Sequence, residues 1–340
     1  MGSAVRQFAP FAAVLAAAAL ASVAPATAQE PAEPAGRTTL IELTPHLAVN
    51  DAAERIEAMD YTGAIEILDT FNANQAEPVP EAYYLLGLAH YQLGEHLKAL
   101  PPARRAVELA PDAPASWLEL VASVLKQLGD HRSAIPVLER LVELAPGNKT
   151  YWTELSLAYE QVDDYEKSLA TMRLAYAAEL LTDDADYRRL SDLLVHEGIP
   201  LAAAEVLEQG LAAHIVQPDE AAYTKVGTAW YMAGETDKAV PALENAARAA
   251  DTGDAYVRLA NLHITRQEWA AAIAALHAGM GRGSLTDEAH ANLLMGVALY
   301  AQGKFDEARE WLTMAAESER HRAMANDYLT AIEARTAARQ

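Results

Sequence analysis

The chain has 340 residues, and its 26 Lys and Arg against 48 Asp and Glu give a formal net charge of −22. A chain this acidic repels nucleic-acid phosphates, so general nucleic-acid binding would need a strong local basic surface, and no basic run is present. Because the chain has no cysteine, disulfides, thiolate metal sites, iron–sulfur clusters and cysteine nucleophiles are excluded.

Residues 1–28 are predicted to be a cleavable secretory signal. Arg6 precedes an apolar stretch over about 8–24, and residues 26–28 (ATA) have the small-x-small form that signal peptidase accepts. The alternative is a retained membrane anchor, which the short length of the stretch disfavours. Cleavage would leave Gln29 as the first residue of an exported, periplasmic protein and lower the net charge to −23.

Residues 29–43 are expected to form a flexible leader. They begin with QEPAEPAGRT, which is rich in Pro, Glu and Ala and has no apolar period. No later run of 18 apolar residues follows, so no membrane span is expected after the signal.

The rest of the chain repeats with a period of about 35 residues. Small residues recur every 33 to 36 positions, at Ala52, Gly87, Ala122, Ser156, Ser191, Gly227, Ala260 and Gly296. A second small residue follows each of these by 12 positions, at Ala64, Ala99, Ala134, Ser168, Ala203, Ala239, Ala272 and Ala308. Four positions later come Leu68, Ala103, Leu138, Met172, Leu207, Leu243, Leu276 and Leu312. Three registers that agree over eight units indicate a repeat array.

Each unit is predicted to contain two helices, because its apolar residues follow helical spacing and a turn signal divides it. Five units carry glycine at the same mid-unit position, where a left-handed C-cap would reverse the chain: Gly94, Gly129, Gly198, Gly234 and Gly303. Pro101, Pro136 and Pro241 share one position, which we interpret as just inside the start of the second helix. The small residues are expected where the two helices cross.

This pattern resembles the tetratricopeptide repeat. Unit two carries most of the motif, as Tyr83, Leu86, Gly87, Tyr91, Gly94, Ala99, Ala106 and Pro111. The final unit carries Met295, Gly296, Tyr300, Gly303, Phe305, Ala308 and Ala315. The resemblance covers about residues 44–320 and implies an all-α, right-handed superhelical solenoid of about eight helix-turn-helix repeats. The first unit departs from the motif, because it lacks the glycine and the leading aromatic residue.

The expected units lie near 45–78, 80–113, 115–147, 149–182, 184–217, 220–251, 253–285 and 289–320. Residues 321–340 are predicted to form a capping helix and tail, since a terminal repeat needs a polar outer face.

The resemblance implies a concave groove lined by the first helix of each unit. The candidate partner-binding residues in that groove are Tyr84, Tyr91, Lys126, Arg188, Arg189, Lys225, Tyr231, Arg258, Asn261 and Tyr300. Tyr84 and Tyr91, seven residues apart, are expected to form an exposed aromatic anchor.

Units five to seven gather several of the few cations of an acidic chain. One hypothesis is that Arg188, Arg189, Lys225 and Arg258, with Asn261, receive an acidic segment or a C-terminal carboxylate of a partner. The alternative is that these cations form surface ion pairs with carboxylates such as Asp192 and Asp254.

No catalytic centre, metal site or cofactor is expected. The ten histidines include no pair at i, i+4 spacing and no His-Glu-x-x-His. The paired carboxylates at 163–164 and 183–186 lie between predicted helices, where they are expected to cap helix N-termini. The glycines of GMGRGS (279–284) follow a helix and are interpreted as an extended turn.

The expected function is an exported protein-interaction scaffold that binds a partner protein or peptide. The stretch from Leu190 to Ala316 resembles periplasmic repeat proteins associated with TonB systems, which implies TonB, ExbB, ExbD or an outer-membrane transporter as partners. One alternative is a scaffold in outer-membrane or peptidoglycan assembly. Another is a glycan-binding or glycan-processing protein, which would need a convergent acid/base pair that a repeat array has no obvious place for.

Overall fold

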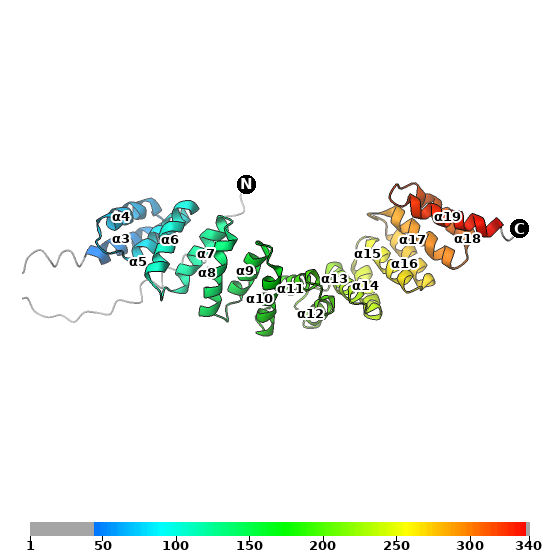
Figure 1. Cartoon of the computed structure of the whole chain (residues 1–340), viewed down its shortest axis with the longest axis horizontal. Helices are drawn as coiled ribbons and strands as arrows, with labels where there is room; N and C mark the ends of the chain where they lie inside the picture. The colour runs from blue at the N-terminus through cyan, green and yellow to red at the C-terminus, as the bar shows by residue number, and fades with distance from the viewer. Residues whose placement is uncertain (1–43, 338–340) are drawn as a thin grey trace, which may run out of the picture. The chain divides into compact units, whose positions relative to one another are not determined.

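The computed structural model describes residues 44–337, all of whose regular secondary structure is helical. The predicted signal (1–28) and leader (29–43) lie outside the described residues. Seventeen helices are present in the described part of the chain, in the order shown in Figure 1. None of these helices is long and apolar enough to cross a bilayer.

Sixteen of the helices form eight consecutive pairs, each joined by a short turn. The pairs are α3 (Thr44–Glu57) with α4 (Tyr61–Asn74), α5 (Pro80–Gln92) with α6 (His96–Leu109), α7 (Ala115–Gln127) with α8 (His131–Leu144), α9 (Lys149–Glu160) with α10 (Tyr165–Ala177), α11 (Asp184–His196) with α12 (Pro200–Ala212), α13 (Glu220–Met232) with α14 (Thr236–Ala249), α15 (Asp254–Thr265) with α16 (Trp269–Arg282), and α17 (Glu288–Ala301) with α18 (Phe305–Ala316). A last helix, α19 (Arg322–Ala337), contacts α17 and α18. The fold is a solenoid of helix-turn-helix repeats.

The chain divides into two compact units. Unit 1 ends at Asp164 and contains α3 to α9, and unit 2 starts at Tyr165 and contains α10 to α19. The boundary falls at the turn inside the fourth repeat, whereas the sequence analysis treats residues 44–320 as one array.

The small residues of the repeat lie where the two helices of a pair cross, as predicted. All three registers of small and apolar residues are buried. A methyl group added to Gly87 would lie 2.9 Å from the backbone nitrogen of Ala103, and one added to Gly296 would lie 2.5 Å from the side chain of Leu312. These crossings therefore require glycine, because a larger residue would push the helices apart.

The mid-unit turns use the left-handed conformation that the glycine pattern predicts. Gly94, Gly129, Gly198, Gly234 and Gly303 all have φ between 71° and 81°. The other three repeats place a non-glycine residue at the same position, two residues before the second helix, with φ near 60° at Met59, Asp163 and Gln267. The missing glycine of the first repeat therefore changes the residue at the turn and leaves the turn geometry in place.

Two sequence interpretations are wrong in detail. The proline position lies inside the second helix, since α6 begins at His96 and Pro101 is its sixth residue. Each such proline removes one hydrogen bond within the helix. The glycines of GMGRGS do not form an extended turn, because α16 runs to Arg282 and positive φ angles occur only after it, 75° at Gly283 and 54° at Ser284. Close packing explains the glycine at position 279, because a methyl group there would lie 2.9 Å from the carbonyl oxygen of Gly253.

Asp183 caps a helix as expected. Its carboxylate accepts a hydrogen bond from the backbone N–H of Asp186, at the start of α11. Asp163 has a different role, since it occupies the left-handed turn position before α10.

Candidate interaction surface

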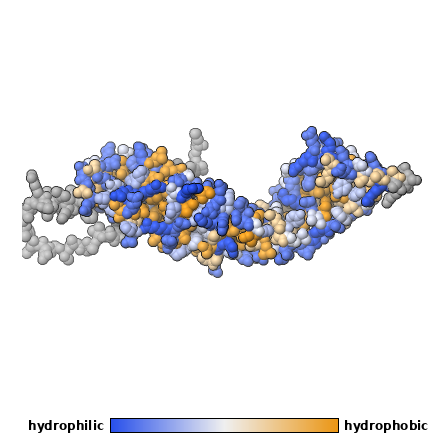
Figure 2. Space-filling view, viewed as in Figure 1, coloured by the Kyte–Doolittle hydropathy of each residue, from blue (hydrophilic) through white to orange (hydrophobic). Residues whose placement is uncertain are grey.

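The first helices of successive repeats contact one another within each unit. In unit 1, α3 contacts α5 and α5 contacts α7, and in unit 2 the sequence α13, α15, α17 and α19 does the same. Consecutive second helices do not approach each other to this extent in the described part of the chain. The first helices thus form a continuous surface in each unit, which we call the first-helix face. Hydrophilic residues cover much of the visible surface of both units, with hydrophobic residues between them (Figure 2).

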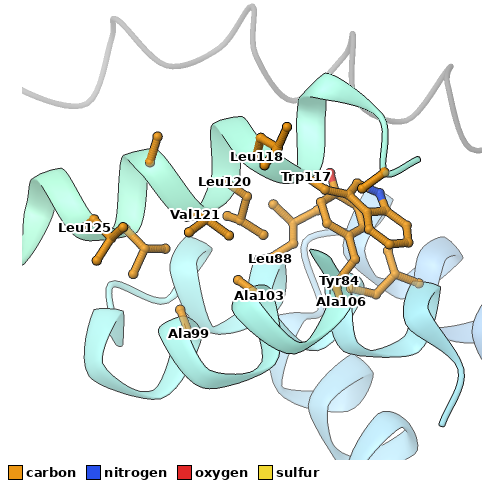
Figure 3. Packing of buried hydrophobic residues seen from close by; sticks show 14 of the residues in the cluster. Tyr84, Leu88, Ala99, Ala103, Ala106, Trp117, Leu118, Leu120, Val121 and Leu125 are labelled. Atoms are coloured by element: carbon orange, nitrogen blue, oxygen red, sulfur yellow. The ribbon is translucent and has the colours of Figure 1, made fainter. Parts of the chain in front are cut away.

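Tyr84 does not lie exposed on this face, which corrects the predicted aromatic anchor. Its exposed fraction is 7%, and its ring stacks on Trp117 of α7, with centroids 5.1 Å apart and an interplanar angle of 10°. Figure 3 shows the two rings lying against each other among Leu88, Leu118 and Leu120. Burial raises the pKa of the Tyr84 hydroxyl to about 12. Tyr84 therefore packs one repeat against the next.

Tyr91 is half-buried and belongs to a polar row that crosses three first helices of unit 1. Burial raises the pKa of its hydroxyl, which is hydrogen-bonded to Ser123 of α7. Lys126, three residues further along α7, donates from Nζ to Oε1 of Glu154 on α9 at 2.9 Å. The predicted groove residues Tyr91 and Lys126 thus lie close to each other, and Lys126 is already paired with a carboxylate.

Arg188 is enclosed by polar partners from two repeats. Its Nε lies 2.6 Å from Asp184, and its Nη2 lies 3.0 Å from Asp219 and 3.3 Å from the carbonyl oxygen of Gln217. Its side chain is only 16% exposed. The hydrogen bond to Asp184 raises the pKa of Arg188 and lowers that of Asp184. This guanidinium therefore ties repeat five to repeat six and has little surface to offer a ligand.

The other predicted cations do not converge on one point. Lys225 of α13 is hydrogen-bonded to Asp192 of α11. This contact is one of the surface ion pairs that were the alternative to ligand binding. Arg189 is half-buried on α11 beside Arg188. The cations are therefore distributed along the face, and Lys225, like Lys126 and Arg188, is neutralised by carboxylates of a neighbouring repeat.

Arg258 differs from the other cations because it borders open space on both sides. Its side chain is 48% exposed and pairs only with Glu220, at 3.4 Å, within the described residues. One hollow, of about 590 Å³, lies toward α13 and is lined by Asp219, Glu220, Ala221, Thr224, Ala249, Asp251 and Arg258. A second hollow, of about 270 Å³, lies toward α17 and is lined by Asp254, Val257, Arg258, Asn261, Thr286, Asp287 and His290.

Of the residues that line these hollows, Arg258 and Asn261 are among the predicted groove residues, whereas His290, Thr286 and Asp287 are not. Asp287 caps α17 through the backbone N–H of His290, at 2.8 Å, and lies 3.0 Å from Nε2 of His321. The hydrogen bond from His321 lowers the pKa of Asp287, and burial lowers the pKa of His290. The repeat register could have located His290, because it lies in the first turn of a predicted first helix.

The two remaining candidates have separate environments. Tyr231, at the end of α13, is 44% exposed. Tyr300 of α17 packs against Tyr328 of α19, with ring centroids 5.2 Å apart, and the guanidinium of Arg335 lies 5.1 Å from its ring. Tyr300 therefore holds the last helix in place.

The described residues contain no group of three His, Asp or Glu side chains placed to hold a metal ion. The hollows beside Arg258 are lined by carboxylates, one guanidinium, one imidazole and amide or hydroxyl groups. Such groups can pair with the side chains and backbone of an extended peptide.

The comparisons with known structures agree with the fold. The C-terminal part of a repeat-containing protein from Cytophaga hutchinsonii is 14% identical, with 71% of this chain and 97% of that chain covered and a TM-score of 0.50. The structure of Naa15/Naa10 bound to HypK-THB is 14% identical, with 74% and 39% covered and a TM-score of 0.55. The MamA protein is 21% identical, with 52% and 94% covered and a TM-score of 0.45. At these identities the likeness to the first two structures shows the fold alone.

No curated protein sequence matches the chain. A family model described as tetratricopeptide repeat matches residues 52–114, 122–180, 189–255 and 257–332, which is more than half of the chain. The last of these matches includes α19 up to Ile332, so that helix occupies the place of a further first helix. The chain belongs to the tetratricopeptide repeat family.

Proposed function

We propose that this protein is an exported, non-enzymatic scaffold that binds a partner protein along the first-helix face of unit 2. The observation that carries the proposal is the pair of hollows separated by Arg258, on α13, α15 and α17. They provide adjacent sites for successive residues of an extended segment, on a face whose helices already support one another through the repeat packing. Tetratricopeptide repeats are scaffolds for protein interaction, which supports the same conclusion.

The test compares the partners that the immobilised protein captures with those captured by two variants. One of these variants blocks the first-helix face of unit 2. Ala221→Trp places a large side chain at the edge of the hollow between α13 and α15, where Ala221 is exposed. Ala278→Trp, on an exposed position of α16, makes the same substitution on a second helix. A specific partner is lost with Ala221→Trp and retained with Ala278→Trp. Equal capture by both variants would show that the partner binds elsewhere.

Export to the periplasm is part of the proposal and is supported by the sequence of residues 1–28. An apolar stretch that follows one basic residue and ends in Ala26-Thr27-Ala28 has the form of a cleavable signal. Mass spectrometry of the protein from a periplasmic fraction should give Gln29 as the first residue. A protein that retains residues 1–28 in the cytoplasm would overturn this part of the proposal.

A TonB-ExbB-ExbD system is the proposed setting, supported by the resemblance of residues 190–316 to periplasmic repeat proteins of such systems. The test is calorimetric titration of the mature chain with the purified periplasmic domains of TonB and ExbD. Binding that Ala221→Trp abolishes is the expected result. Absence of binding to both domains would remove this setting and leave the scaffold proposal intact.

A further inference from the structure

The two hollows beside Arg258 have more carboxylates than cations in their lining, although Asp219 pairs with Arg188 and Asp287 lies against Arg320 and His321. Their walls contain five carboxylates and one guanidinium: Asp219, Glu220, Asp251, Asp254 and Asp287 against Arg258. The whole chain carries a formal charge of −22, so the field of the protein adds to this local excess.

The cations that an acidic partner would need are already engaged on this face. Arg188 lies between Asp184 and Asp219, Lys225 is bonded to Asp192, and Arg258 is bonded to Glu220. An acidic segment would have to displace a carboxylate at each of these cations, in a region that is negative overall. Charge complementarity therefore disfavours an acidic occupant.

The hollow between α13 and α15 retains unused acceptors. Asp251, in the turn before α15, is exposed and has no hydrogen bond or ion pair within residues 44–337. Glu220 holds Arg258 through only one of its two oxygens. Thr224 borders the same hollow, but its hydroxyl oxygen is buried, so Glu220 and Asp251 are the acceptors that a ligand can reach.

We propose that the occupant of this face is an extended basic segment of a partner protein, with a Lys or Arg side chain in the hollow between α13 and α15. The cation meets the carboxylates of Glu220 and Asp251 there. The acidic field of the chain accelerates the encounter, and salt weakens it. The inference rests on the proposed function and specifies the chemistry of its partner.

The probe is a fluorescent, extended peptide in which Lys alternates with Ser and Gly, titrated with the mature chain at low salt. The reference probe has Glu in place of Lys. The test variant is Glu220→Gln with Asp251→Asn. The matched control is Glu307→Gln with Glu310→Gln, two exposed carboxylates of the second helix α18. Both double variants change the net charge by the same amount, so a difference between them reports position and not overall charge.

The Lys peptide should bind more tightly than the Glu peptide, and the Glu220/Asp251 variant should weaken its binding about tenfold or more while the control changes it little. Equal weakening in both variants would overturn the proposal, because attraction would then be non-specific. Tighter binding of the Glu peptide would also overturn it. The scaffold function would survive either result, since the Ala221→Trp capture experiment does not depend on charge. Unchanged thermal unfolding of both variants establishes that they remain folded.

Discussion

The ring of Tyr84 stacks on the indole of Trp117, with centroids 5.1 Å apart, and joins the first helices of repeats two and three. Each repeat buries its apolar side chains against its neighbours, so such contacts between repeats hold the array together. The resemblance to the tetratricopeptide repeat implies a groove position for Tyr84, whereas the structure places it in this stack.

Removal of the Tyr84 ring should destabilise unit 1. Tyr84→Ala leaves a cavity beside Trp117 and should lower the free energy of unfolding by about 3 kcal/mol. Tyr84→Phe keeps the stack, removes only the hydrogen bond to Ser116 and should cost about 1 kcal/mol. Urea denaturation followed by tryptophan fluorescence gives both values. Similar losses in the two variants would show that the hydroxyl matters more than the ring.

The close crossing at Gly296 should not accept a side chain. A methyl group there lies 2.5 Å from Leu312, so Gly296→Ala should destabilise unit 2 by about 1–3 kcal/mol. Leu312 is buried, so Leu312→Ala alone should also destabilise the unit, by about 2–5 kcal/mol. The double variant should lose less than the sum of the two single losses, because removal of the Leu312 side chain also removes the clash. Gly281→Ala serves as the control, since nothing lies within 4 Å of a methyl group at that position of α16. Denaturation curves of these four variants measure the losses, and additive losses in the double variant would contradict the close contact between Gly296 and Leu312.

A glycine in the turn of repeat seven should increase the stability of the protein. Gln267 has φ of 60°, a conformation that costs about 1 kcal/mol or more for a residue with a side chain. Gln267→Gly should therefore stabilise the protein by about 0.5–1 kcal/mol after the entropy of glycine is counted. The reverse change, Gly234→Ala in repeat six, should destabilise it by a similar amount. Differential scanning calorimetry should show melting temperatures that move in opposite directions.

The His290 imidazole should make the C-terminal repeats sensitive to acid. Burial and the nearby His321 lower its pKa from 6.5, while Asp287 opposes this effect and Arg320 adds to it. The unfolded chain then takes up the proton first as the pH falls, so stability declines below about pH 6.5. The pKa of Asp287 is lowered from 3.8, so its contribution is lost only at much lower pH.

His290→Asn should reduce the loss of stability between pH 7.5 and 5.5. His277→Asn, at an exposed position of α16, should not. Urea denaturation at the two pH values compares both variants with the unmodified chain. An identical pH dependence in His290→Asn would exclude this histidine as the cause.

Charge reversal at Arg188 and at Arg258 should have different effects on the stability of the protein. Arg188→Glu places a third carboxylate between Asp184 and Asp219, and should destabilise the contact between repeats five and six by about 2 kcal/mol or more. Arg258→Glu, at a half-exposed position with one partner, should leave thermal unfolding almost unchanged. Arg258→Glu is therefore the variant to use in binding experiments, because its fold should remain intact. A large loss of stability in Arg258→Glu would contradict the half-exposed position of Arg258.

Periodicity in the sequence is sufficient to predict the all-α repeat fold, because three periodic registers of small and apolar residues specify where paired helices cross. Ser191 and Gly227 are at those crossings, and Gly94 and Gly303 are in the left-handed turns, as the spacing indicated. These features depend on residues within one repeat, where separation along the chain fixes separation in space.

Which candidate groove residues are available to a partner depends on how neighbouring repeats pack against each other. Tyr84 is covered by Trp117, 33 residues away, and Arg188 is enclosed by Asp219, 31 residues away. Such contacts join different repeats, and their geometry depends on how neighbouring helices are rotated and packed, which periodicity does not encode. For the same reason, the hollows beside Arg258, with Asp251 and His290 in their walls, could be recognised only once the repeats were stacked.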